Sequence, residues 1–214
     1  MTVTAKICGL NDTAGLAAAI DGGAAMAGFL FYPPSPRAVS PMAAAALMAQ
    51  LPGSVRSVAV LVDPDDGLLD TLVAATPAEI LQLHGQESPE RVAEIRARTG
   101  RRVMKAVKVK DAADLDAAAA FEPVADFLLF DAWPPGRDGA LPGGNGEAFD
   151  WPLLAGRRFR LPWLLSGGLH AGNLAAAVAT SGAAQVDVSS GVEIRPGVKD
   201  PARIRAFLAA CAAL

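Results

Sequence analysis

Short apolar runs alternate with alanine-rich stretches along almost the whole chain, and this alternation constrains the fold more than any other feature. Strands are predicted over residues 3–8, 27–31, 57–62, 80–83, 103–109, 127–131, 163–166 and 186–189. Several of these runs are continuously apolar, which is typical of parallel strands that are buried on both faces. Helices are predicted between them over residues 13–20, 41–50, 89–98, 112–120, 171–180 and 201–213.

The repeat of roughly 25 residues predicts an α/β fold, a single (β/α)8 TIM barrel with parallel strands. An open doubly wound sheet is the alternative, but such sheets usually have fewer strands. No composition break marks a linker, so residues 1–214 are expected to form one catalytic domain. Ser40-Pro41, Ser88-Pro89 and Asp200-Pro201 each pair a capping residue with a proline, which predicts helix starts.

Composition excludes several classes of function. The mean hydropathy is high, but the sequence contains no uninterrupted apolar run of about eighteen residues, the length needed to span a bilayer. The first ten residues lack the pattern of a secretory signal, so a cytoplasmic protein is expected. A net charge of −3 argues against nucleic acid as a partner. Two cysteines and two histidines offer no ordinary zinc site, so no metal is expected.

Polar and glycine residues cluster where the predicted strands end. In a barrel of this kind the chemistry lies at the C-terminal ends of the strands, so these residues predict one composite pocket. They are Cys8-Gly9, Ser35-Pro36-Arg37, His84-Gly85, Asp131, Gly167-Gly168 and Ser189-Ser190-Gly191.

The loops after the seventh and eighth strands are candidates for a phosphate site. Gly167-Gly168 and Ser189-Ser190-Gly191 allow backbone amides to approach an anion, and a short helix near Gly191 would point its N–H groups at it. Either loop alone reads better as a tight turn, but both together favour phosphate binding. The run Gly143-Gly144-Asn145-Gly146 is a lid or a further set of amide donors, so Gly144, Asn145 and Gly146 join the phosphate-binding candidates.

Cys8 and Asp131 are the candidate proton-transfer pair. A free cysteine is most often a small buried hydrophobe, but Cys8 ends the first strand on the active face. Lys6, on the same face of that strand, is a candidate to stabilise its thiolate. Asp131 follows an apolar strand that should desolvate the carboxyl and favour its neutral, proton-donating form. Cys211 lies in a predicted helix and is assigned to the core.

Two further side chains are ambiguous from spacing alone. Arg37 can grip a carboxylate with its planar guanidinium, although a solvated surface arginine fits the pattern equally well. His84 reads evenly as a site residue or as a turn histidine. His170, at the start of the predicted seventh helix, reads as structural.

Taken in order, these segments resemble the phosphoribosylanthranilate isomerase family along nearly the whole chain. The matching stretches are Lys6-Ile7-Cys8-Gly9, Gly28-Phe29-Leu30-Phe31, Ser35-Pro36-Arg37, Gln82-Leu83-His84-Gly85, Phe130-Asp131, Gly143-Gly144-Asn145-Gly146, Phe149-Asp150-Trp151, Leu165-Ser166-Gly167-Gly168-Leu169, Asp187-Val188-Ser189-Ser190-Gly191-Val192-Glu193 and Pro196-Gly197-Val198-Lys199-Asp200. No single motif identifies the family, but so many motifs in the same order along the chain make the resemblance specific.

The resemblance implies an isomerase that carries out an Amadori rearrangement in tryptophan biosynthesis. Cys8 matches the family's general base and Asp131 its general acid, while Arg37 matches the residue that engages the anthranilate carboxylate. His84 and Asp187 match positions near the sugar. The implied reaction converts a phosphorylated small molecule without cofactor, and the resemblance leaves monomer and homodimer open.

Some features depart from the family or favour other readings. The proline- and glycine-rich connection over 133–142, which precedes the predicted lid, is longer than in some relatives. Another phosphate-binding barrel of aromatic amino-acid biosynthesis and a non-catalytic phosphosugar-binding barrel are the alternatives. Indole-glycerol-phosphate synthase would need a lysine and glutamate set that no strand end supplies. A dual-substrate isomerase of histidine biosynthesis would have an aspartate in place of Cys8.

Overall fold

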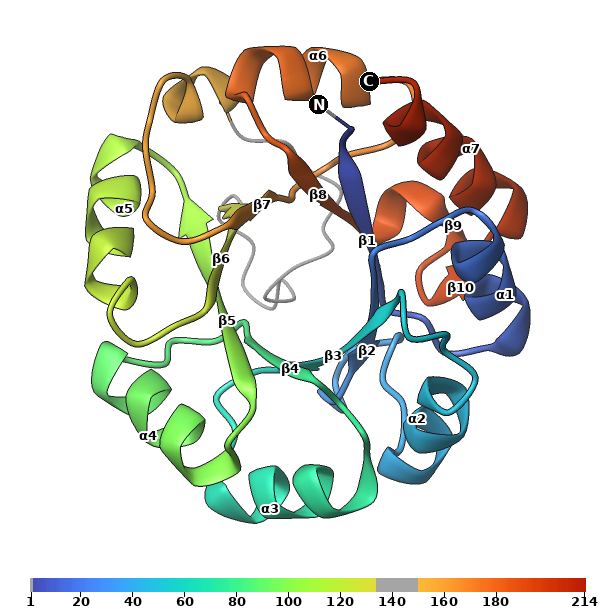
Figure 1. Ribbon diagram of the computed structural model, residues 1–214, viewed down its shortest axis with the longest axis vertical. Coiled ribbons are helices and arrows are strands. Elements are labelled where there is room, and N and C mark those ends of the chain that lie inside the picture. The colour runs from blue at the N-terminus through green and yellow to red at the C-terminus, as the bar shows by residue number, and fades with distance from the viewer. Residues whose placement is uncertain (1, 134–149) are drawn as a thin grey trace.

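Eight parallel strands close into a barrel, and helices form a ring around it (Figure 1). The computed structural model describes residues 2–133 and 150–214. In barrel order the strands are β1 (Thr4–Cys8), β2 (Met26–Leu30), β3 (Arg56–Leu61), β4 (Ile80–Leu83), β5 (Arg102–Val109), β6 (Phe127–Ala132), β7 (Trp163–Leu165) and β8 (Gln185–Val188). The predicted TIM barrel is therefore confirmed, and the open sheet is wrong.

Helices alternate with the strands. They are α1 (Thr13–Asp21), α2 (Pro41–Met48), α3 (Asp66–Ala75), α4 (Pro89–Thr99), α5 (Ala112–Ala117), α6 (Leu174–Ser181) and α7 (Pro201–Ala212), with 3-10 turns η1 (Ala118–Phe121), η2 (Trp151–Leu154) and η3 (Ser190–Val192). Of these, α3 lies in a segment for which no helix was predicted. The predicted caps are present, because the side chains of Ser40, Ser88 and Asp200 accept backbone N–H groups at the starts of α2, α4 and α7.

The helix predicted over 171–180 begins later, at Leu174. The amide oxygen of Asn173 accepts from the His170 N–H at 2.8 Å, and its Nδ2 donates to the Gly168 carbonyl at 3.0 Å. These local bonds fold residues 170–173 into a turn, as asparagine side chains often do. His170 lies in this turn, before α6 begins at Leu174, so the prediction that it starts the helix is wrong.

Side chains alternate between two apolar layers, as the period of two in a strand requires. Met26, Val58, Ile80, Met104 and Leu129 belong to a cluster inside the barrel. A second, larger cluster packs the outward faces of the strands against the helices. Towards the C-terminal ends of the strands polar residues replace the apolar ones on the inner face, and this change positions the site.

A two-stranded hairpin that the sequence pattern did not predict follows η3. It consists of β9 (Glu193–Arg195) and β10 (Val198–Lys199), and Gly197 between them has a φ of +81°. In Figure 1 the hairpin lies outside the barrel beside α1 and α7.

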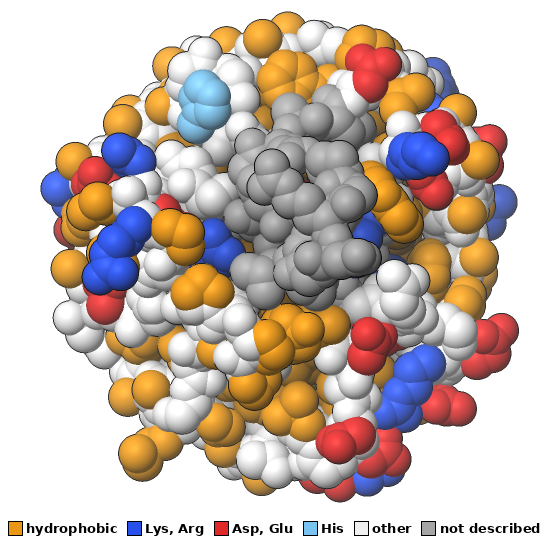
Figure 2. Space-filling view, turned by 180° about the vertical axis from the view of Figure 1, so that it is seen from behind, with side chains coloured by type: hydrophobic (Ala, Val, Ile, Leu, Met, Phe, Trp, Pro, Cys, Tyr) orange, Lys and Arg blue, Asp and Glu red, His pale blue; other side chains and the backbone are white. Residues whose placement is uncertain are grey.

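Acidic and basic side chains are interspersed around the rim of the face in Figure 2. Within the described ranges, no helix combines the length and the apolar character needed to cross a membrane.

Candidate active site

A buried ion pair joins the first and last strands inside the barrel. Lys6 and Asp187 are register partners on β1 and β8, and Nζ donates to Oδ1 at 2.8 Å. Ser166, directly after β7, donates its hydroxyl to Oδ2 of Asp187 at 3.1 Å. Lys6 is 0% exposed and Asp187 4%. The two charges therefore depend on each other, because a buried charge needs a partner.

Cys8 lies at the end of β1, half-buried and on the same inward face as Lys6. Both side chains lie against Gly28 of β2, where an added Cβ would sit 3.1 Å from Lys6 Cε and 3.2 Å from Cys8 Sγ. Burial raises the pKa of the Cys8 thiol, while the charges of Lys6 and Lys199 act in the opposite direction. Lys6 thus favours the thiolate as expected, but burial outweighs it.

Asp131, on the inward face of β6, forms a chain of polar contacts with β4. His84 Nε2 lies 3.1 Å from Asp131 Oδ2, and His84 Nδ1 lies 2.8 Å from Gln82 Nε2. Asp131 Oδ1 accepts the Ala132 N–H at 3.0 Å. His84 is buried, and both of its ring nitrogens have partners in this chain of contacts, which brings it together with Asp131.

Glycines allow the loops after β7 and β8 to pack against each other. Gly167 and Gly168 both have positive φ, at 89° and 61°. An added Cβ on Gly191 would sit 1.9 Å from the Leu169 carbonyl oxygen, so only glycine fits there. The short helix expected near Gly191 is the 3-10 turn η3, which starts at Ser190. These loops are adjacent, as the phosphate prediction requires.

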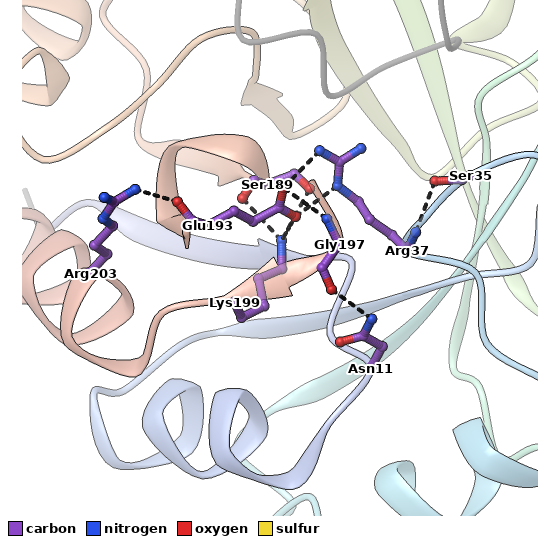
Figure 3. A network of polar contacts seen from close by, with 8 residues as sticks. All are labelled: Asn11, Ser35, Arg37, Ser189, Glu193, Gly197, Lys199 and Arg203. Atoms are coloured by element: carbon purple, nitrogen blue, oxygen red, sulfur yellow. Dashed lines mark hydrogen bonds and ion pairs between the residues drawn. The ribbon is translucent and has the colours of Figure 1, made fainter. Parts of the chain in front are cut away.

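Arg37 is 4% exposed, so the reading of a solvated surface arginine is wrong. Its Nε and Nη2 donate to the two carboxylate oxygens of Glu193 at 2.8 and 2.9 Å (Figure 3). Its backbone N–H donates to Ser35 Oγ at 3.2 Å. Gly9 lies beside it, where an added Cβ would approach Arg37 Cδ to 2.9 Å. Arg37 thus lies close to the strand end that carries Cys8.

The candidates Gly144, Asn145 and Gly146, with the connection over 134–142, lie outside the described residues. In residues 2–133 and 150–214 no group of three or more His, Cys, Asp or Glu side chains is arranged to hold a metal ion.

Sequence reasoning assigned no role to Gln82, Ser166, Glu193 or Lys199. Gln82 and Ser166 had a usable signal, because each is a polar residue that the period of two places on an inward face. Glu193 and Lys199 had none, since their pairing depends on the hairpin of β9 and β10.

Comparisons with known proteins agree with this geometry. The family model for N-(5'phosphoribosyl)anthranilate (PRA) isomerase matches residues 5–210. The chain belongs to this family. A PRA isomerase from Rhodospirillum centenum is 58% identical over 214 residues and covers 100% of both chains. One from Paracoccus denitrificans is 57% identical over 209 residues, covering 98% of this chain and 97% of the relative.

Solved structures of PRA isomerases have the same barrel. The enzyme from Thermotoga maritima has a TM-score of 0.87 at 33% identity, covering 99% of this chain and 100% of that one. A PRA isomerase in complex with reduced 1-(o-carboxyphenylamino)-1-deoxyribulose 5-phosphate has a TM-score of 0.85 at 32% identity, with the same coverage.

Proposed function

We propose that this isomerase converts N-(5'-phosphoribosyl)anthranilate to 1-(2-carboxyphenylamino)-1-deoxyribulose 5-phosphate, a step of tryptophan biosynthesis, with Cys8 as base and Asp131 as acid. One observation carries the assignment. Cys8 and Asp131 are inward-facing residues at the C-terminal ends of β1 and β6, and β7 and β8, with their glycine loops, lie between those strands. A ligand anchored at the two loops would lie between the sulfur and the carboxyl.

Asp131 starts the reaction by giving its proton to the ring oxygen of the ribose. The ring opens as the electron pair of the anthranilate nitrogen forms the C1'=N bond of a Schiff base. The Cys8 thiolate then removes the proton from C2'; the electrons of that bond form the C1'=C2' bond of an enolamine, and the C1'=N pair returns to nitrogen. Tautomerisation adds a proton at C1' and removes the hydroxyl proton at C2', which gives the ketone; one proton leaves the Cys8 thiol and one returns to the Asp131 carboxylate. Atoms and charge balance without an external oxidant or reductant, because hydrogen only moves within the substrate and between the two side chains.

Neighbouring residues prepare the pair for these steps. The ammonium of Lys6 is fixed by Asp187 and supplies positive charge where the thiolate forms. His84 orients the Asp131 carboxyl through Nε2, and Gln82 in turn orients the imidazole. His84 and Asp187 are also the residues we assign to the sugar.

The two anionic ends of the substrate have separate partners in this proposal. Arg37 engages the anthranilate carboxylate, since a buried guanidinium suits a planar anion. The phosphate is assigned to the amides and hydroxyls of the adjacent loops, which are Gly167, Gly168, Ser189, Ser190 and Gly191, together with Gly144, Asn145 and Gly146. The reduced product that a related isomerase binds carries the same two groups.

We further propose that residues 1–214 work as one catalytic domain in the cytoplasm, as a monomer or a homodimer. One related isomerase from Thermotoga maritima is described as dimeric.

The activity test uses freshly made phosphoribosylanthranilate and follows the loss of its anthranilate-type fluorescence. A downstream indole-glycerol-phosphate synthase is coupled to remove the product. We expect turnover by the purified chain without added metal or cofactor. Binding of the reduced product without any turnover would show a non-catalytic phosphosugar-binding barrel and refute the proposal.

A further inference from the structure

Glu193 is a buried carboxylate at the start of β9 whose oxygens contact two cations. It is 5% exposed. Oε1 accepts from Arg37 Nε and from Lys199 Nζ, each at 2.8 Å, and Oε2 accepts from Arg37 Nη2 at 2.9 Å (Figure 3). The Gly197 N–H donates to Oε2 at 3.3 Å. Glu193 thereby joins the loop after β2 to the hairpin of β9 and β10.

Lys199 extends this network to the end of β8. Its Nζ donates to the Ser189 carbonyl at 3.0 Å and to the Ser189 hydroxyl at 3.3 Å. Ser189 begins the loop that we assign to the phosphate. Glu193 is therefore in direct contact with the arginine assigned to one end of the substrate. Through one lysine it reaches the loop assigned to the other end.

The charge of Glu193 is maintained by these partners. Burial opposes ionisation, but the hydrogen bonds from Arg37 and the charges of Lys199 and Arg37 outweigh it, so the pKa of Glu193 is below its ordinary value. Glu193 therefore presents its negative charge to both cations at once.

We propose that Glu193 is a positioning residue that fixes the plane of the Arg37 guanidinium and, through Lys199, the position of Ser189. It would thus set the spacing between the two anion-binding ends of the site. The paired contact through Nε and Nη2 allows one orientation of the guanidinium, which a single contact would not. The inference rests on the proposed roles of Arg37 and of the loop after β8.

The test measures the binding of two probes to the purified chain. One is reduced 1-(2-carboxyphenylamino)-1-deoxyribulose 5-phosphate, and the other is the same molecule without the carboxylate. Glu193→Gln keeps the size of the side chain but removes the charge that binds two cations. We expect about a tenfold or greater loss of affinity for both probes, the loss typical of a hydrogen bond to a charged group. Arg37→Ala should weaken only the carboxylated probe.

Two comparisons separate positioning from general damage. With the carboxylated probe, Arg37→Ala and Glu193→Gln should be less than additive, because Glu193 acts partly through Arg37. KM should rise more than kcat falls, since the acid and base are untouched. Glu94→Gln, on the exposed face of α4, is the matched control and should leave both affinities unchanged.

The outcomes decide between the two proposals. Wild-type protein that binds neither probe and does not turn over the substrate refutes the proposed function itself. Normal wild-type binding, with Glu193→Gln no weaker than Glu94→Gln or fully additive with Arg37→Ala, overturns the role of Glu193. If Glu193→Gln does not fold, Glu193→Asp keeps the charge but is too short to reach both cations. Glu193→Asp should lower the affinity for both probes while its unfolding midpoint stays near that of the wild type. Wild-type affinity in Glu193→Asp would overturn the positioning role of Glu193.

Discussion

Replacing Lys6 by methionine should destabilise the barrel strongly. The change keeps most of the volume of the side chain but removes the ammonium that lies 2.8 Å from the Asp187 carboxylate. Lys6 is 0% and Asp187 4% exposed, so water cannot take the place of the lost partner. Removing one member of a buried pair typically costs about 3–5 kcal/mol. Among the residues that the structure describes, Ser166 remains as the hydrogen-bond donor to this carboxylate, and it carries no charge.

The double variant Lys6→Met/Asp187→Leu should recover most of that loss. Apolar residues of similar size can replace a buried ion pair with about no net change in stability. The coupling energy, which is the sum of the two single losses minus the loss of the double variant, should therefore be at least about 3 kcal/mol. The free energy of unfolding is measured by urea denaturation at pH 7, and the slope with urea should be unchanged. Turnover should not recover, because the charge beside Cys8 stays absent.

A surface pair provides the control. Arg98 and Asp70 form an exposed ion pair at 2.7 Å, and Arg98→Met should leave the unfolding midpoint unchanged within error. The reasoning is refuted if Lys6→Met costs less than about 1 kcal/mol. It is also refuted if the double variant is as unstable as the sum of the single ones.

Three other outcomes are expected. The rate at which iodoacetamide alkylates Cys8, followed by mass spectrometry, should rise about tenfold per pH unit to beyond pH 9. The reason is that only the thiolate reacts and burial raises the pKa of the thiol. A rate that reaches a plateau below pH 8 would contradict this. Cys211 is 3% exposed and burial raises its pKa to about 11, so it too should react slowly below that pH. Arg37→Ala should weaken anthranilate-bearing ligands at least about tenfold more than ribulose 5-phosphate in competition assays, and equal losses would exclude its carboxylate role. Gly191→Ala places a Cβ 1.9 Å from a carbonyl oxygen, so it should lower the free energy of unfolding by about 1–3 kcal/mol and raise KM. Gly53→Ala, which has open space around its Cβ, should change neither quantity. Similar urea midpoints for the two variants would argue against close packing at Gly191.

Most of the fold could be predicted from patterns of residues that are close together in the sequence. Apolar runs and capping prolines predicted the strands and the starts of α2, α4 and α7, because both signals depend on residues close in sequence. The start of α6 was wrong because Asn173 forms local bonds that compete with the helix.

The period of two in a strand accounts for the positions of Cys8 and Asp131, because every second residue of a strand points to the same face, here the inside of the barrel. The ion pairs of the site were beyond this reasoning. Arg37 and Glu193 are 156 positions apart, and Lys6 and Asp187 are 181 apart. Such pairs depend on the closure of the barrel and on the hairpin of β9 and β10, and no local sequence pattern predicted that hairpin.

The most direct test of the central claim compares turnover with binding in Cys8→Ala and Asp131→Asn. Both changes remove the ability to move a proton and leave the anion-binding residues intact. We expect kcat to fall by about a hundredfold to ten-thousandfold in each variant, the usual contribution of acid–base catalysis. Affinity for the reduced product should stay within a few-fold of the wild type, as measured by titration. Turnover near the wild-type rate in either variant would contradict the account.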